Sequence, residues 1–391
     1  FKNVTGIDEL KLRAGWGIVG NDRSRPYAWY GLVDTLQKYL IGGQNQPAFI
    51  ATTLENKDLR WEKTSQVDIG LDLTLLHGRL TFTTDYYTKK TTDLLLEVTQ
   101  PTSTGFASAL QNAGSIENKG FEFQVSSKNF VRENFRWATD FNISFNKGKV
   151  LDIVGTTLHT GEVNPAGTSL NTAIVQAGSP LGSFYGKYSQ GVDPATGKIV
   201  YLKTADGGAD SVGIIGNANP KFIFGFSNSF TIKNFTLDFF FQGVQGNDIL
   251  NATRILTESM VLPMNQSATV LNRWKNPGDV TDIPGVSPSN WDNSAVSTRY
   301  VENGSYIRLK ALTLGYNIPA EKLKRLKMSR FMVYCTVENL LTFTNYSGFD
   351  PEVSAFSSTG QGATNQNTAP GVDFGTYPHS RDFILGLNLS F

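Results

Sequence analysis

The last eleven residues of the chain, RDFILGLNLSF (381–391), alternate between large apolar side chains and mostly smaller or polar ones. The apolar row consists of Phe383, Leu385, Leu387, Leu389 and Phe391. Between them lie Gly386, Asn388 and Ser390, with Ile384 as an apolar exception. Because successive side chains of a β-strand point to opposite faces, this period of two predicts a strand with one apolar face.

The same alternation recurs along the chain in ELKLRAGWGI (9–18), QVDIGLDLTL (66–75), FRWATDFNISF (135–145) and NFTLDFFFQG (234–243). These runs are about ten residues long, whereas strands of soluble sheets usually have about five or six. A strand of that length, tilted by about 45°, is what crossing a bilayer requires. The pattern predicts an all-β protein with roughly 12 to 14 strands in this chain.

The polar faces of these strands carry charged residues, namely Lys11, Arg13, Asp68, Asp72, Glu122, Asp140 and Asp238. Short connectors such as LHGR (76–79), IKNF (232–235) and NFVREN (129–134) contrast with long ones at 20–63, 92–117, 247–302 and 342–381. A soluble β-sandwich also alternates, but its strands are shorter. Charges on one face and long loops at one end favour a transmembrane antiparallel β-barrel with long extracellular loops and short periplasmic turns. Lipid cannot satisfy an open sheet edge, so such a sheet must close.

Composition narrows the class of protein further. Only 18% of the 391 residues are charged, 38 are glycine, and the net charge of +1 gives no support for a nucleic-acid partner. The single cysteine, Cys335, excludes an intrachain disulfide. No run approaches the 18 to 20 or so apolar residues of a membrane helix. FKNVTGIDEL (1–10) does not resemble a signal peptide, and we expect the chain to be part of a longer protein.

The residue patterns of catalytic and metal sites are missing from the sequence. His77, His159 and His379 are far apart, and no HExxH or Cys/His ligand spacing occurs, so we expect no metal, no cofactor and no catalytic residues. HSRD (379–382) is interpreted as a loop before the last strand, because a catalytic triad needs side chains from different segments. KTADGGADSVGI (203–214) supplies too few spaced oxygen ligands for calcium and is interpreted as a Gly-rich turn.

Three local patterns predict irregular backbone. In YIRLKALTLGY (306–316) the apolar phase changes near Lys310, which suggests a β-bulge. Gly78 is suited to positive φ in the LHGR turn, and Asp350 followed by proline suggests a rigid loop anchor. PAEKLKRLKM (319–328) is interpreted as a single helical turn or a solvated connector, with a membrane-surface or partner-binding helix as the alternative.

Several longer stretches resemble one family, the SusC/RagA-like TonB-dependent transporters of the outer membrane of Bacteroidetes. They are LENKDLRWEKTSQVDIGLDLTLLHGRLTFTTDYYTKKTTDLLL (54–96), NAGSIENKGFEF (112–123), NPKFIFGFSNSFTIKNFTLDFFFQGVQGNDILN (219–251), RWKNPGDVTDIP (273–284), NGSYIRLKALTLGYNIP (303–319) and VENLLTFTNYSGFDPEVS (337–354). The resemblance implies that residues 1–391 form the C-terminal part of a barrel of about 22 strands. The N-terminal extension, the plug and the first strands would then lie outside this chain.

The resemblance also implies a function and its partners. It implies TonB-dependent import of a glycan or peptide nutrient across the outer membrane, together with a SusD-like surface lipoprotein. TonB would act through the part that this chain lacks. The chain would contact outer-membrane lipid, and the barrel-assembly machinery would recognise the terminal strand from Phe383 to Phe391. A siderophore- or cobalamin-type receptor, an outer-membrane barrel enzyme and a soluble β-rich adhesin are the alternatives.

Aromatic residues in the long connectors are the candidate contact residues of this protein. They are Tyr27, Trp29, Tyr30, Trp291, Tyr346 and Phe349. Large rigid rings of this kind can stack on sugar faces or anchor a partner protein. They can equally pack the loops or join an interfacial aromatic belt.

Overall fold

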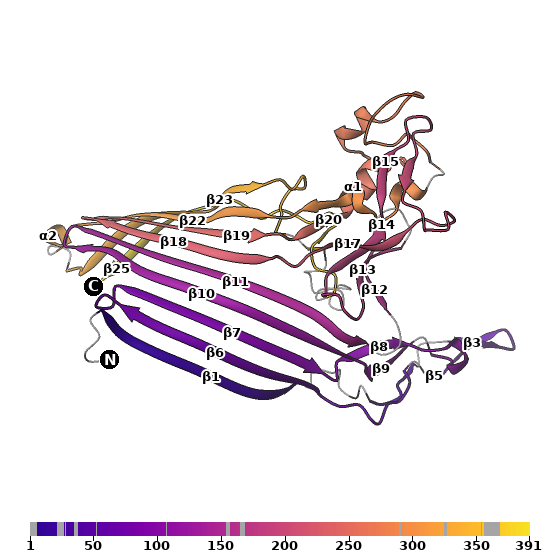
Figure 1. Ribbon diagram of the computed structural model, residues 1–391, viewed down its shortest axis with the longest axis horizontal. Coiled ribbons are helices and arrows are strands. Elements are labelled where there is room, and N and C mark those ends of the chain that lie inside the picture. The colour runs from indigo at the N-terminus through magenta and orange to yellow at the C-terminus, as the bar shows by residue number, and fades with distance from the viewer. Residues whose placement is uncertain are drawn as a thin grey trace.

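The fold is dominated by one large antiparallel sheet (Figure 1). This computed structural model describes residues 6–21, 27, 29–34, 38–51, 53–106, 108–153, 157–164, 169–288, 291–323, 327–352, 354–355 and 368–391. The ten strands of the sheet, in spatial order, are β1 (Ile7–Asn21), β6 (Glu62–Leu75), β7 (Leu80–Thr92), β10 (Gly114–Arg132), β11 (Phe135–Ile153), β18 (Phe222–Ile232), β19 (Phe235–Gln245), β22 (Tyr306–Asn317), β23 (Arg330–Thr344) and β25 (Asp382–Ser390). Each strand pairs with the one before it in this order, so the sheet is a meander.

The register of the sheet separates an apolar face from a polar one. Leu12 pairs with Leu71, while the next residue, Arg13, pairs with Gly70, so like side chains share a face. Trp16 and Leu385 are highly exposed on the apolar face. The strands run from 9 to 19 residues, which confirms the length expected for crossing a bilayer.

The connections also confirm the predicted asymmetry. Short turns join β6 to β7, β10 to β11, and β18 to β19, and Gly78 has the expected positive φ of 71° in the first of them. The long connections all leave the opposite end of the sheet, and the N- and C-terminal ends lie at the short-turn end (Figure 1). The predicted 12 to 14 strands exceed the ten that form the large sheet among the described residues. Ten strands form the sheet because the connection between β11 and β18 folds separately beyond the sheet's end.

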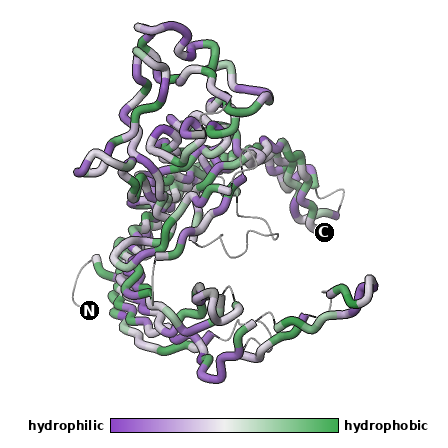
Figure 2. Tube along the Cα trace, turned by 90° about the vertical axis from the view of Figure 1, so that its right-hand side faces the viewer, coloured by the Kyte–Doolittle hydropathy of each residue, from purple (hydrophilic) through white to green (hydrophobic). Residues whose placement is uncertain are grey.

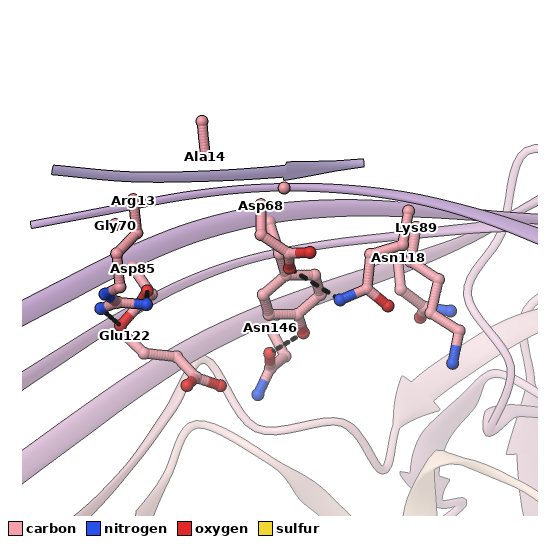
Figure 3. A pocket seen from close by; sticks show the side chains of 12 residues that line it. Arg13, Ala14, Asp68, Gly70, Asp85, Lys89, Asn118, Glu122 and Asn146 are labelled. Atoms are coloured by element: carbon pink, nitrogen blue, oxygen red, sulfur yellow. Dashed lines mark hydrogen bonds and ion pairs between the residues drawn. The ribbon is translucent and has the colours of Figure 1, made fainter. Parts of the chain in front are cut away.

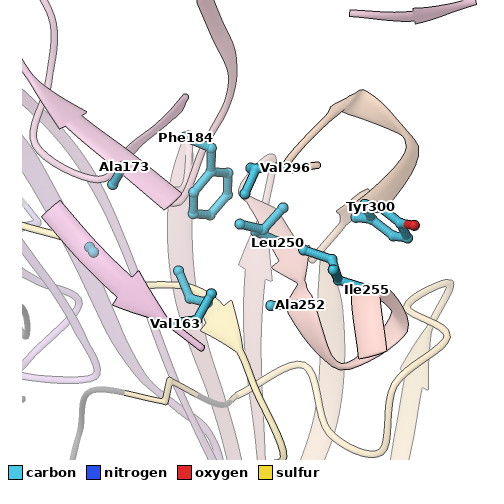
Figure 4. Packing of buried hydrophobic residues seen from close by; sticks show 10 residues of the cluster. Val163, Ala173, Phe184, Leu250, Ala252, Ile255, Val296 and Tyr300 are labelled. Atoms are coloured by element: carbon cyan, nitrogen blue, oxygen red, sulfur yellow. The ribbon is translucent and has the colours of Figure 1, made fainter. Parts of the chain in front are cut away.

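Three long connections combine into a loop subdomain, made of the described residues within 157–221, 246–305 and 368–375. Its strands are β12 (Leu158–Val163), β13 (Leu170–Val175), β14 (Ser183–Lys187), β15 (Ser189–Val192), β16 (Ile199–Tyr201), β17 (Val212–Asn217), β20 (Asp248–Asn251), β21 (Val301–Asn303) and β24 (Val372–Asp373). Its helices are α1 (Ala252–Glu258), η2 (Ala268–Asn272), η3 (Trp291–Ser294) and η4 (Thr298–Tyr300). Its buried core contains Phe184, Leu250, Ile255 and Tyr300 (Figure 4), together with Val372 and other apolar residues.

The remaining connections form smaller elements. They are β2 (Val33–Asp34), β3 (Lys38–Ile41), β4 (Gln44–Pro47), β5 (Ile50–Ala51), β8 (Leu95–Thr99), η1 (Thr102–Thr104), β9 (Ser108–Asn112) and α2 (Ala320–Leu323). The four residues of α2 confirm the single helical turn expected within 319–328, of which 324–326 lie outside the described residues. Within the described part of the chain, no helix has the length and apolar character needed to span a membrane.

The predicted bulge lies at Lys310. Phe240 pairs with Ala311 and the next residue, Phe241, pairs with Leu309, so Lys310 is the extra residue. The pairing of β22 with β23 shifts at the same place. The bulge allows the apolar row of β22 to stay on one face despite its change of phase.

Seen along its length, the sheet is an open arc whose edge strands are β1 and β25 (Figure 2).

Candidate functional site

The concave polar face of the sheet is built from side chains that neutralise one another. Arg13 on β1 lies 2.9 Å from a carboxylate oxygen of Asp72 on β6. It also lies 2.8 Å from a carboxylate oxygen of Asp85 on β7 (Figure 3). The guanidinium reaches across the intervening strand at Gly70. A Cβ at that position would lie 2.6 Å from the guanidinium carbon and 2.3 Å from an Asp85 oxygen. A glycine is therefore needed where the ion pair crosses β6.

A second cross-strand contact lies further along the same face. The ring of Tyr87 lies over Gly120, where an added Cβ would come within 2.3 Å of the ring. The Tyr87 hydroxyl donates a hydrogen bond to the Asn146 amide oxygen on β11. This geometry explains why residue 120, in the NKGFEF stretch, is a glycine, because a larger residue would leave no room for the Tyr87 ring. Glu122, two residues after Gly120 on β10, faces the same side of the sheet.

These contacts border an open depression of about 870 Å³. Figure 3 shows Arg13, Asp85, Glu122 and Asn146 pointing into it, whereas Ala14 points away from the polar face. Carboxylates, cationic side chains and neutral amides line the depression, so its walls are mainly polar. Such a surface can border a water-filled path for a polar solute. Across the described residues, no group of three or more His, Cys, Asp or Glu side chains is placed to hold a metal ion.

A buried ionic cluster fixes the loop after β23 to the polar face of β22. Arg308 is buried and donates to Asp350 at 2.5 Å and to Glu352 at 2.9 Å. The backbone N–H and the ring Nδ1 of His379 contact the other Asp350 oxygen at 3.0 and 2.8 Å. Burial alone would raise the pKa of Asp350, but the backbone N–H of Glu352, Arg308 and His379 together lower that pKa to about 2. The structure thus confirms the loop anchor expected at Asp350.

A second ionic cluster holds α1 in the loop subdomain. Arg254 lies 3.0 Å from Glu258 and 2.9 Å from Glu302, and its guanidinium lies over the ring of the buried Tyr300. Burial raises the pKa of the Tyr300 hydroxyl, which donates to the backbone carbonyl of Asn293. All of these contacts lie within the connection between β19 and β22, where they hold α1 against η3, η4 and β21.

The predicted contact aromatics lie in different surroundings. Tyr27 is exposed, and the Trp29 and Tyr30 rings lie with centroids 4.4 Å apart on an exposed connector. Phe349 is 84% exposed. Tyr346 is only 6% exposed, and its hydroxyl donates to Asp373 at 2.5 Å, so this ring packs inside the loops, as the alternative interpretation had it. Trp291 begins η3, and its side chain lies outside the described residues.

The terminal strand is arranged as its sequence predicts. β25 pairs with β23 from Asp382 to Ser390, and its apolar row is exposed at Phe383, Leu385, Leu387, Leu389 and Phe391. The row forms a continuous apolar surface with that of the neighbouring strand. Its exposure in water would be unfavourable, and contact with lipid removes this cost.

Some residues that shape these sites were missed from the sequence. The partners Asp85 and Tyr87 follow the same alternation as Asp72, so a search of every polar-face position could have found them. The pairing of Asp350 with Arg308 and His379 joins β22 to two distant parts of the connection between β23 and β25, and no sequence period indicates it.

Long antiparallel strands, one apolar and one polar face, and long loops at one end define the wall of an outer-membrane β-barrel. The chain belongs to the family described as TonB dependent receptor-like, beta-barrel, whose family model matches residues 6–340. This family places the chain in the bacterial outer membrane.

The similarity to individual relatives extends over the whole chain. TonB-dependent receptor P3 of Formosa agariphila is 35% identical over 415 residues, which cover 100% of this chain and 40% of that protein. TonB-dependent receptor SusC of Bacteroides thetaiotaomicron is 28% identical over 425 residues, covering 100% of this chain and 38% of that protein. A solved structure of the RagAB peptide transporter is 27% identical, with a TM-score of 0.81, and the match covers 100% of this chain and 42% of that one. The chain therefore spans about two fifths of the relatives it matches.

Proposed function

We propose that this chain forms the C-terminal barrel section of a TonB-dependent importer that takes up a glycan or peptide nutrient together with a SusD-like surface lipoprotein. The observation that carries the proposal is the likeness to the RagAB peptide transporter, with a TM-score of 0.81 over 100% of this chain. The similarity to SusC over the same span supports it. Residues outside this chain would supply the plug and the contact with TonB.

The geometry supports passive roles for this section in transport. The polar face carries ion pairs that are satisfied within the wall, such as Arg13 with Asp72 and Asp85, and it would line the path of the solute. The loop subdomain would form part of the outer rim. We propose that the exposed rings of Tyr27, Trp29, Tyr30 and Phe349 contact the substrate or the lipoprotein, and that no catalytic step takes place in the barrel.

Deletion of the gene in the native bacterium tests the import proposal. Cells that lack the full-length protein are expected to lose growth on one class of glycan or peptide and to recover it with the intact gene. Affinity purification of the full-length protein from native membranes should recover a surface lipoprotein in equal amount. Unchanged growth on every glycan and peptide source, together with purification of the barrel alone, would contradict the proposal.

A further inference from the structure

The apolar row of β11 becomes a basic row near the long-loop end of the sheet. Phe135 and Phe145 begin and end the apolar row, and Lys147 and Lys149 continue it, because residues two apart on a strand share a face. The separation between the two phenylalanines corresponds to about 33 Å along a strand and, at a tilt of about 45°, to about 23 Å across a membrane. This height is close to the roughly 25 Å apolar band of an outer-membrane barrel. The two lysines therefore lie at the level of lipid headgroups in the outer leaflet.

The neighbouring strands show the same change from aromatic to basic side chains. The register of β10 with β11 pairs Phe121 with Phe145 and, two residues nearer the long loops, Lys119 with Lys147. On β7, Tyr86 pairs with Phe121, so three aromatic side chains lie level with one another. Aromatic rings gather at membrane boundaries, and lysines reach from there to the headgroups. This part of the lipid face is therefore built as an interfacial zone.

A cavity of about 490 Å³ adjoins the basic row. The pairing of β11 with β18 ends before this cavity, which lies between β11 and the connector that precedes β18. Phe145, Lys147 and Lys149 line it from β11, and Lys221 lines it from the connector. The remaining lining residues are glycines, prolines and asparagines. The described lining thus holds three cations and an aromatic ring without a carboxylate.

The protein leaves the charge of this cavity without a counter-charge. Among the described residues, no carboxylate forms an ion pair with Lys147, Lys149 or Lys221, and all three are exposed. Glu117 pairs with Lys149 in the register, but its carboxylate lies 3.0 Å from the ammonium group of Lys119 instead. Three like charges around one cavity repel one another, and a bound anion removes this repulsion.

The surroundings of the cavity favour an anion that carries apolar chains. Lysine binds phosphate as a point charge, and a phosphate group offers several acceptor oxygens to the three ammonium groups. Phe145 connects the cavity to the apolar row of β11, where acyl chains lie. A lipid with a phosphate headgroup contacts both surfaces, whereas a dissolved phosphate ion contacts only the polar one.

We infer that Lys147, Lys149 and Lys221 form a binding site for the phosphate group of an anionic lipid in the outer leaflet. The tails of this lipid lie along the apolar row that ends at Phe145. The site opens on the lipid face of the wall, whereas the depression around Arg13 lies on the polar face. It therefore concerns the membrane around the barrel and does not depend on which nutrient is imported.

Native mass spectrometry of the full-length protein, purified in a neutral maltoside detergent, tests the site by counting bound lipid during a titration. The probe is monophosphoryl lipid A, and the same lipid without its phosphate is the matched ligand control. A lysine beside an anionic lipid surface contributes about fivefold to affinity. The triple variant Lys147→Gln/Lys149→Gln/Lys221→Gln should therefore bind the phosphorylated lipid roughly 100-fold more weakly than the wild type. The corresponding triple arginine variant keeps the three charges and should retain binding.

A second triple variant controls for the loss of charge itself. Lys38→Gln/Lys198→Gln/Lys275→Gln removes three exposed lysines from connectors outside the ten-stranded sheet, and its affinity should equal that of the wild type. Both glutamine variants should melt at or above the wild-type temperature in lipid-free detergent, because each loses exposed positive charge.

Three results would overturn the inference. They are equal binding of the phosphorylated and dephosphorylated lipid by the wild type, equal affinity in the two glutamine variants, and failure of the arginine variant to bind. Inorganic phosphate, added in excess, distinguishes a lipid from a dissolved ion. Displacement of the lipid by phosphate at equal concentration would assign the lysines to a dissolved anion instead, and the lipid site would then be wrong while the import proposal stands.

Discussion

Replacing Asp350 with asparagine should release the loop that precedes the last strand. The carboxylate is buried and accepts hydrogen bonds from the Glu352 backbone, Arg308 and His379. Its pKa falls from an ordinary value of 3.8 to about 2. Each pKa unit is worth 1.36 kcal/mol, so the charged form contributes roughly 2 kcal/mol to the docked state of this loop. Asp350→Asn removes that contribution at neutral pH.

The sign of the pH dependence follows from the lowered pKa. A carboxyl group whose pKa is lower in the folded state stabilises it fully above its ordinary pKa, here 3.8. The stabilisation is lost as the pH falls through about 2. The docked loop of the wild type should therefore weaken between these two values, and the loop of Asp350→Asn should show no such transition there.

Amide hydrogen exchange measures this local opening. For peptides within 368–381, a loss of roughly 2 kcal/mol corresponds to exchange that is about 30-fold faster at pH 7, after correction for intrinsic rates. Glu55→Gln is the matched control, since Glu55 forms a 3.5 Å pair with Lys57 on the surface and exposed pairs contribute little. Exchange in Asp350→Asn within twofold of the wild type would refute the assignment of Asp350 as the anchor.

Three further substitutions test the wall itself in the full-length protein. Gly120→Ala should lower the free energy of unfolding by about 2 kcal/mol, because its Cβ would collide with the Tyr87 ring, while Gly17→Ala, with no atom within 4 Å, should change little in a denaturant titration. Asn228→Ala should cost about 1–3 kcal/mol in the same titration, since Asn228 accepts from the indole N–H of Trp137 at 2.7 Å on the apolar face. Leu387→Arg should cost about 2–4 kcal/mol and reduce the folded fraction in outer-membrane preparations. Asn388→Arg, on the opposite face of β25, should reduce it much less, and equal losses would contradict the orientation of that strand.

The wall could be predicted from the sequence because one local rule governs it. Residues two apart share a face, and a membrane on one side with water on the other leaves this rule visible in the order of side chains. The same rule revealed the bulge at Lys310, because an extra residue changes the phase of the apolar row. The pairing of Arg13 with Asp85 needed the register of three strands, which alternation alone leaves open.

The loop subdomain escaped prediction for a different reason. β13 is buried on both faces for most of its length, so its LNTAIV sequence lacks the alternation that marks the wall strands. Its core joins residues from three connections, such as Phe184, Leu250 and Val372. The burial of Tyr346 could not be predicted for the same reason. Its partner, Asp373, is far along the chain, and only the folded loops show that the ring is buried.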